Sequence, residues 1–319
     1  MNEPPLTFHV GQRVREQMQK VICGQESVID HCLAGLLTRG HVLLEGVPGT
    51  AKTLIVRVLA RTLGCQFKRV QMTPDLMPAD ILGTNIYDPG TGKFRLRRGP
   101  IFTNLLLADE INRAPAKTQA ALLEAMEEGV VTIDGEDYRL EEPFMVFATQ
   151  NPIEHEGTYP LPEAELDRFM FKVIVDYPAR ETEARMLRMH NSGFDPRDLD
   201  SLGIEQAADR ETLLRCRREV IETTVQEAIL DYILQLVAAT RESPLLRLGG
   251  SPRSAAVLLL ASKAFAVLAG RRYVIPEDVI AAALPTLRHR IILQPEAELD
   301  GITPDMALKT IIESIPVPR

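Results

Sequence analysis

Eight residues in the first quarter of the chain have the composition and spacing of a phosphate-binding loop. Residues 46–53 read GVPGTAKT; they follow the apolar run 41–45 and open a stretch with helical apolar periodicity. A glycine-containing loop between a strand and a helix turns its backbone N–H groups toward an anion, and the positive end of the helix dipole adds to the attraction. Lys52 then supplies a charge for the outer phosphates, and Thr53 supplies a hydroxyl for a magnesium ion. The pattern predicts a nucleoside triphosphate site.

Ala51 occupies the position at which the general pattern has a glycine before the lysine. Because alanine accepts helical dihedrals, we expect Ala51 inside the first helical turn. The alternative is that the segment is only a glycine-proline turn that joins a strand to a helix. The predicted nucleotide-binding residues of this loop are Gly46, Val47, Pro48, Gly49, Thr50, Ala51, Lys52, Thr53 and Leu54.

Two carboxylates end a second apolar run. Residues 105–108 are followed by Asp109 and Glu110. Alone, such a pair is more often the solvated end of a strand, but together with a phosphate-binding loop it predicts Asp109 as a metal-shell residue and Glu110 as a general base. A third apolar run, 144–149, precedes Asn151 by one residue. Asn151 is either a turn residue before proline or an amide that holds the attacking water or the γ-phosphate in line.

The elements that position these side chains follow from apolar periodicity. Strands are predicted at 41–45, 67–71, 104–108, 143–149 and 170–175, and helices at 52–63, 74–82 and 115–128. Two further helical segments are predicted between residues 8 and 37, with a break at Cys23-Gly24. The alternation predicts an α/β fold with a parallel sheet flanked by helices, in which ligands lie beyond the carboxyl ends of the strands.

Two polar insertions interrupt this alternation. Residues 83–99 and 129–140 each have a glycine-containing turn between short alternating runs, which predicts β-hairpins projecting from the core. A basic strip on the first hairpin consists of Lys93, Arg95, Arg97 and Arg98. Such a strip is either a solvated face or a grip for an acidic partner or a nucleic acid.

Composition divides the chain into a nucleotide-binding core at 1–190, a polar linker at 191–225 and a smaller all-helical domain at 226–319. Helices in the last part are predicted at 226–241, 252–269, 276–283 and 304–314. A length of 319 residues is suited to two domains.

The bulk composition excludes several classes of protein. The net charge of −8 provides no global basic field, so a nucleic-acid partner is not expected. The four cysteines have no CxxC spacing and the six histidines form no HExxH motif, so neither structural zinc nor a disulfide framework is expected. We expect no membrane span and no signal peptide, and therefore a cytoplasmic location.

The order and wording of these motifs resemble the AAA+ ATPases, and within them the MoxR subgroup. The resemblance runs from about Val21 to Leu287. It is carried by GVPGTAKT at 46–53, LLLADEINRAPAKTQAALLEAMEE at 105–128, FATQNPIEHEGTYPLPEAELDRF at 147–169 and GGSPRSAAVLLLASKAFA at 249–266. It implies a P-loop NTPase core with a helical lid domain, and Ala51 resembles the usual residue of the subgroup.

The resemblance also implies residue roles. Asn151 matches the family's sensor asparagine, Arg168 its arginine finger, and Arg253 a second sensor arginine in the lid. The finger would meet charge on the γ-phosphoryl group of the neighbouring subunit's nucleotide, an effect of about 10³ to 10⁵ in rate in other systems. Arg253 follows Ser251 and Pro252, a predicted N-cap and first-turn proline, so we expect the helix start to aim it at phosphate. The alternatives are a surface salt bridge for Arg168 and an exposed arginine for Arg253.

The adenine pocket implied by the family lies against the segment 21–25. Its predicted residues are Val21, Ile22 and Gly24, although both apolar side chains are equally suited to a plain core.

The function implied by the resemblance is that of a Mg²⁺-dependent, ATP-hydrolysing homo-hexameric ring. It would remodel, mature or activate partner proteins as a chaperone does, for instance proteins with von Willebrand A-type domains that receive a metal. An alternative is a nucleic-acid-associated AAA+ motor, but no DNA-binding module is recognisable after Leu287. A second alternative is a scaffold that binds nucleotide without turnover, which would lack Glu110 or Arg168; both are present.

Overall fold

The structure, a computed structural model, describes residues 3–152 and 157–318. Its centre is a five-stranded sheet with the strand order β2-β5-β8-β1-β9, and every neighbouring pair is parallel. The strands are β1 (His41–Glu45), β2 (Phe67–Gln71), β5 (Leu105–Asp109), β8 (Met145–Gln150) and β9 (Phe169–Ile174). The five predicted strands are thus confirmed to within two residues at each end, as is the α/β fold class.

The two faces of the sheet contribute to two separate hydrophobic cores, because successive strand residues point to opposite sides. Val42 and Leu107 belong to the first core, with the N-terminal helices and most of the C-terminal part; Leu43 and Leu106 belong to the second. The first face is covered by α1 (Leu6–Gln19), α2 (Glu26–Leu37) and α3 (Lys52–Thr62), and the second by α4 (Pro78–Leu82) and α5 (Ala116–Glu128).

Helix α4 is shorter than the predicted segment 74–82. It begins only at Pro78, because a proline disfavours helical dihedrals at the residue before it, and Met77 is extended at φ −95°, ψ 155°. The Asp80 carboxylate accepts a hydrogen bond from the Met77 N–H (2.9 Å), which stabilises the helix start at this point.

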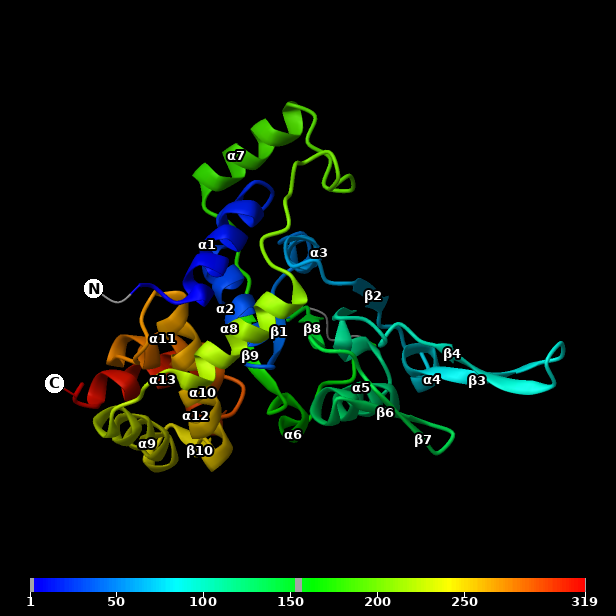
Figure 1. Cartoon of the computed structure of the whole chain (residues 1–319). Helices are drawn as coiled ribbons and strands as arrows, with labels where there is room; N and C mark the ends of the chain where they lie inside the picture. The colour runs from blue at the N-terminus through cyan, green and yellow to red at the C-terminus, as the bar shows by residue number, and fades with distance from the viewer. Residues whose placement is uncertain (1–2, 153–156, 319) are drawn as a thin grey trace.

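Both predicted hairpins are confirmed. The first pairs β3 (Gly83–Asp88) with β4 (Lys93–Arg98), and the second pairs β6 (Val130–Ile133) with β7 (Glu136–Arg139). Figure 1 shows the β3–β4 hairpin extending far from the sheet. At its base the chain crosses closely, since a Cβ on Gly99 would lie 2.1 Å from the Ile81 carbonyl oxygen.

The C-terminal part is mainly helical, as predicted. Its main helices are α9 (Glu227–Glu242), α10 (Pro252–Leu268), α11 (Pro276–Leu287) and α13 (Pro304–Ser314). The prediction missed the short helix α12 (Pro295–Leu299) and an antiparallel pair of β10 (Leu246–Leu248) with β11 (Ile292–Leu293).

A packed helix, α8 (Arg210–Glu222), lies inside the segment expected to be a linker. The Asp209 carboxylate caps it by accepting from the Thr212 N–H (2.8 Å), and Leu213, Cys216 and Val220 are buried. This narrow apolar stripe is difficult to recognise among charged residues.

The remaining elements are η1 (Ile111–Arg113), α6 (Glu163–Leu166) and α7 (Arg180–Asn191). Across the described ranges, no helix combines the length and apolarity that a bilayer span needs.

Candidate nucleotide site

The phosphate-binding loop joins β1 to α3. Ala51 has left-handed dihedrals (φ 63°, ψ 17°), and the helix begins at Lys52. The expectation that Ala51 lies inside the first helical turn is therefore wrong. The chain turns sharply between Gly49 (φ 87°) and the helix, and this turn needs a second residue with positive φ. A left-handed alanine costs about 1–2 kcal/mol, whereas glycine accepts this conformation freely.

The loop lies tightly against the sheet and surrounds the ammonium group of Lys52. A Cβ on Gly46 would lie 2.3 Å from the Val175 carbonyl oxygen, so only glycine fits there. The Lys52 Nζ donates to the carbonyl oxygens of Gly46 (2.5 Å) and Val47 (2.8 Å). Thr50 Oγ1 also donates to the Val47 carbonyl (3.0 Å), which closes the turn.

Lys52 lies within electrostatic reach of both predicted acids. Burial lowers the pKa of Lys52, while the negative charges of Asp109 and Glu110 act in the opposite direction. The structure therefore brings these three predicted site residues together at the carboxyl ends of the strands. Thr53, in the first turn of α3, is half-buried beside them.

Asp109 is 8% exposed and both of its carboxylate oxygens accept hydrogen bonds. Arg69 Nε and Nη2 donate to Oδ2 (2.9 and 2.6 Å), and Thr149 Oγ1 donates to Oδ1 (2.5 Å). Arg69 was not predicted as a site residue. It reaches Asp109 because β2 is the neighbour of β5 in the sheet, a fact of strand order that has no local sequence signal.

Glu110 is held by two side chains at its carboxylate. Gln71 Nε2 donates to Oε2 (2.8 Å), and so does Arg113 Nη1 (2.9 Å). The backbone of Glu110 is left-handed at φ 58°, an uncommon conformation that occurs preferentially at functional sites. Asn151 is buried at the end of β8, which lies between β5 and β1, so it lies at the same edge of the sheet as Glu110 and the loop.

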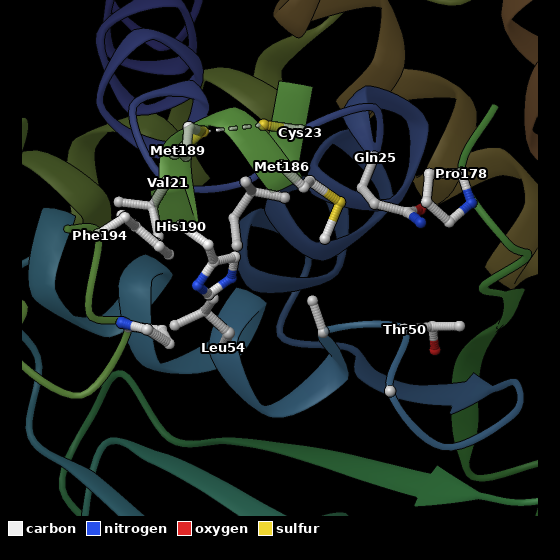
Figure 2. A pocket seen from close by; sticks show the side chains of 14 residues that line it. Val21, Cys23, Gln25, Thr50, Leu54, Pro178, Met186, Met189, His190 and Phe194 are labelled. Carbon is white, nitrogen blue, oxygen red and sulfur yellow. Dashed lines mark hydrogen bonds between the residues drawn. The ribbon is translucent and has the colours of Figure 1, made fainter. Parts of the chain in front are cut away.

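An apolar cavity of about 200 Å³ adjoins the loop (Figure 2). It is lined by Val21, Ile22, Cys23, Gln25, Gly49, Thr50, Ala51, Leu54, Pro178, Met186, Met189, His190, Phe194 and Pro196. Val21, Ile22 and Leu54 were predicted to contact the nucleotide. Gly24 does not line the cavity; a Cβ at this glycine would meet Thr182 of α7 at 2.7 Å.

Helix α7 contributes part of this cavity, and sequence reasoning did not assign it to the site. In Figure 2, Met186, Met189 and His190 line the cavity together with Leu54 of α3. Met189 Sδ also lies 3.6 Å from Cys23 Sγ. No residue of α7 is buried, which means that this helix contributes little to the hydrophobic core. It nevertheless supplies several of the apolar side chains that line the cavity.

Arg168 and Arg253 lie together at a different place. Arg168 contacts the Glu127 carboxylate at 3.1 Å and donates to the Leu123 carbonyl (2.9 Å). Arg253 contacts the same Glu127 at 3.3 Å and Asp167 at 3.5 Å. Both arginines line a second cavity of about 200 Å³, and neither lines the cavity beside the loop. The predicted helix start is observed, because Ser251 caps α10 and Pro252 is its first residue.

This sheet, loop and pair of acids define a P-loop nucleoside triphosphatase. The sequence profile described as "ATPase family associated with various cellular activities (AAA)" matches residues 41–171, and that of the AAA lid domain matches residues 238–311.

Relatives narrow the class further. The chain is 43% identical to the Chaperone MoxR1 of Mycobacterium tuberculosis, over 98% of this chain and 83% of that protein. It is 46% identical to the uncharacterized protein YeaC of Bacillus subtilis, over 95% of this chain and 93% of YeaC. A crystal structure from Cytophaga hutchinsonii matches with a TM-score of 0.89 at 42% identity, covering 98% of this chain and 97% of the other. The protein belongs to the MoxR family of AAA+ ATPases.

Proposed function

We propose that the protein hydrolyses ATP to ADP and phosphate in a Mg²⁺-dependent reaction, at sites shared between the subunits of a homo-hexameric ring. The observation that carries the proposal is the convergence of Lys52, Asp109 and Glu110 beside the loop and an apolar cavity. Phosphates would be held by backbone N–H groups of residues 46–54 other than Pro48, which has none, and by Lys52, because positive φ at Gly49 and Ala51 turns the loop toward an anion.

The purine would lie in the cavity that Val21 and Ile22 share with α7, with Gly24 leaving room for Thr182 of α7, which an added Cβ would meet at 2.7 Å. A magnesium ion would be held by Thr53 and Asp109, where it would neutralise charge on the β- and γ-phosphate oxygens. The donor set suits this ion, since a hydroxyl and a carboxylate are oxygen ligands. Arg69 donates twice to Oδ2 of Asp109 and Thr149 donates once to Oδ1, so the Arg69 guanidinium would compete with the metal ion for this carboxylate.

The hydrolytic step needs a base for the water that attacks the γ-phosphorus. Glu110 would accept one proton from this water as the bond to the γ-phosphorus forms and the bond to the ADP oxygen breaks. Gln71 and Arg113 orient the Glu110 carboxylate, and the buried Asn151 would hold the water in line.

Arg168 and Arg253 would act on the nucleotide of the neighbouring subunit. Their shared position at Glu127, away from the cavity beside their own loop, supports a common role across an interface. Within one protomer the Glu127 carboxylate contacts both guanidinium groups, and the triphosphate of the neighbour would replace it. Fixed cations at that point stabilise the charge that develops on the γ-phosphoryl oxygens.

The ring would remodel client proteins in the cytoplasm as a chaperone, a proposal supported by the name of the relative MoxR1. We further propose that the client proteins have von Willebrand A-type domains and that the outcome of remodelling is metal insertion. We propose the division into a core at 1–190, a linking segment at 191–225 that contains α8, and a lid at 226–319. A nucleic-acid motor is disfavoured by the net charge of −8.

Two variants test the proposal. Lys52→Ala should lose nucleotide binding, and Glu110→Gln should bind ATP normally but hydrolyse it about 10² to 10⁴ times more slowly, since only the base is removed. Equilibrium binding of a fluorescent ATP analogue and release of phosphate separate the two effects. Glu124→Gln, an exposed glutamate on α5, is the matched control and should behave as wild type. Normal turnover in Glu110→Gln would remove the assignment of the base.

A further inference from the structure

The β3–β4 hairpin has two chemically different faces. Cross-strand pairing places Thr84 opposite Arg97, Ile86 opposite Arg95 and Asp88 opposite Lys93. Because side chains alternate along a strand, these pairs share one face, and the pairs Tyr87–Phe94, Asn85–Leu96 and Gly83–Arg98 share the other, so Arg98 is separated from the other three cations of the predicted strip. One face is therefore mainly cationic and the other mainly apolar.

The apolar face is exposed at the tip and anchored at the base. Phe94 is 73% exposed and Tyr87 is 57% exposed, and their rings pack edge to face with centroids 5.6 Å apart. Nearer the base, Leu96 packs against the second core, and Asn85 Nδ2 donates to the Asp134 carboxylate of the other hairpin (2.9 Å). The aromatic pair is thus held out in solvent on a fixed support.

The cations of this face are Lys93, Arg95 and Arg97, all exposed, and the face has one acid, Asp88, opposite Lys93. Within the described parts of the chain, none of these three forms an ion pair with a carboxylate. Arg98, in contrast, lies over the Phe102 ring at 5.1 Å. Alternate residues of a strand are about 7 Å apart, so the three charges form a regular row. The row belongs to a chain whose net charge is −8.

The hairpin also has free edges. Its sheet has two strands, and no third strand among residues 3–152 and 157–318 extends it. The β3 side lies toward the second hairpin, to which Asn85 is bonded, whereas β4 forms the other edge. An exposed strand edge can pair with an extended peptide through backbone hydrogen bonds, and side-chain pairs then select the sequence.

We propose that β4 binds an extended, acidic segment of a client protein as a third strand. Alternate carboxylates of the segment pair with Lys93, Arg95 and Arg97, and the intervening apolar side chains pack against Phe94, which Tyr87 of β3 contacts from the other side. The spacing supports this occupant, because alternate side chains of an added strand have the same period as the row of cations. The inference rests on the proposed function as a remodelling ATPase and names the chemistry of its client.

A nucleic acid fits this surface less well. Single-stranded nucleic acids bind where cations follow the backbone and aromatic rings stack with bases in the same groove. Here the cations and the Tyr87–Phe94 pair lie on opposite faces, and the two rings already pack against each other.

The test uses the full chain and a fluorescein-labelled synthetic peptide of about ten residues that alternates glutamate with valine or threonine. Fluorescence anisotropy without nucleotide gives its affinity. Arg95→Glu/Arg97→Glu should weaken binding about tenfold or more, because two attractive cross-strand pairs become repulsive. The same variant should gain affinity for a peptide with lysine in place of glutamate. Phe94→Ser should weaken the binding of the glutamate peptide to the otherwise unchanged protein, and of the lysine peptide to the Arg95→Glu/Arg97→Glu variant.

The control Arg218→Glu/Lys309→Glu makes the same charge change at exposed residues of α8 and α13 and should bind as wild type does. Equal loss in the control, or no binding of the acidic peptide to wild type, would overturn the inference. So would tighter binding of a single-stranded oligonucleotide that depends on Arg95 and Arg97. Circular dichroism confirms that each variant is folded. Because the assay needs no turnover, peptide binding in a protein without ATPase activity would refute only the proposed function.

Discussion

His41 couples the stability of the protein to pH. It begins β1, the strand that leads into the phosphate-binding loop, and it is 6% exposed. Its Nδ1 accepts from the Val146 N–H (2.9 Å), and its Nε2 donates to the Met126 carbonyl oxygen (2.9 Å). This pattern requires the neutral ring, because a protonated imidazole has no acceptor for Val146. Burial lowers the pKa of His41 to about 4; the bond to Met126 opposes the shift, and the charge of Arg217 adds to it.

The size and sign of the effect follow from linkage. The unfolded chain has the ordinary histidine pKa of 6.5, so between pH 6.5 and about 4 the unfolded state binds more protons than the folded state. The contribution of His41 is therefore fully present above pH 6.5 and is lost progressively as the pH falls toward 4. Between about pH 7.5 and about pH 5 this one group lowers the free energy of unfolding by about 2 kcal/mol.

The assay is urea unfolding of wild type and His41→Gln at these two pH values. The variant should be less stable at the higher pH by about 1–3 kcal/mol, because a buried bonding partner is changed. Its loss of stability on acidification should be smaller than that of wild type by about 2 kcal/mol. Burial also lowers the pKa of His31 and His289, so a residual pH dependence remains. The exposed His190→Gln is the control. An unchanged pH dependence in His41→Gln would refute the reasoning.

Three further predictions concern the nucleotide site. Ala51→Gly should raise the stability by about 0.5–1 kcal/mol, because relief of the left-handed alanine exceeds the added entropy of the unfolded chain; a lower melting temperature would contradict this. Arg69→Gln should reduce about fivefold the Mg²⁺ concentration needed for half-maximal binding of an ATP analogue, because a partly exposed guanidinium no longer competes for Asp109. A higher Mg²⁺ requirement would show that Arg69 assists the metal. Arg168→Ala should bind ATP but hydrolyse it poorly, and mixing it with Lys52→Ala should restore part of the phosphate release; mixtures no more active than either variant would argue against a shared site.

Local sequence patterns alone predicted the fold class and several candidate site residues of this protein. The loop at 46–53, the five apolar strand runs and the two hairpin turns each depend on neighbouring residues, so the fold class and the acids at 109 and 110 follow from sequence. The left-handed dihedrals of Ala51 could not be predicted from the sequence. They depend on how the loop meets the sheet rather than on the helical preference of alanine.

Tertiary structure alone decided which distant side chains meet. Arg69 reaches Asp109 through strand order, and α7 lines the cavity beside the phosphate-binding loop without an apolar core face of its own. Arg253 lies beside Arg168 rather than beside Lys52 because of how the C-terminal helices pack against the sheet. These contacts join residues far apart in sequence, and their geometry is set by the packing of whole elements, which no short segment encodes.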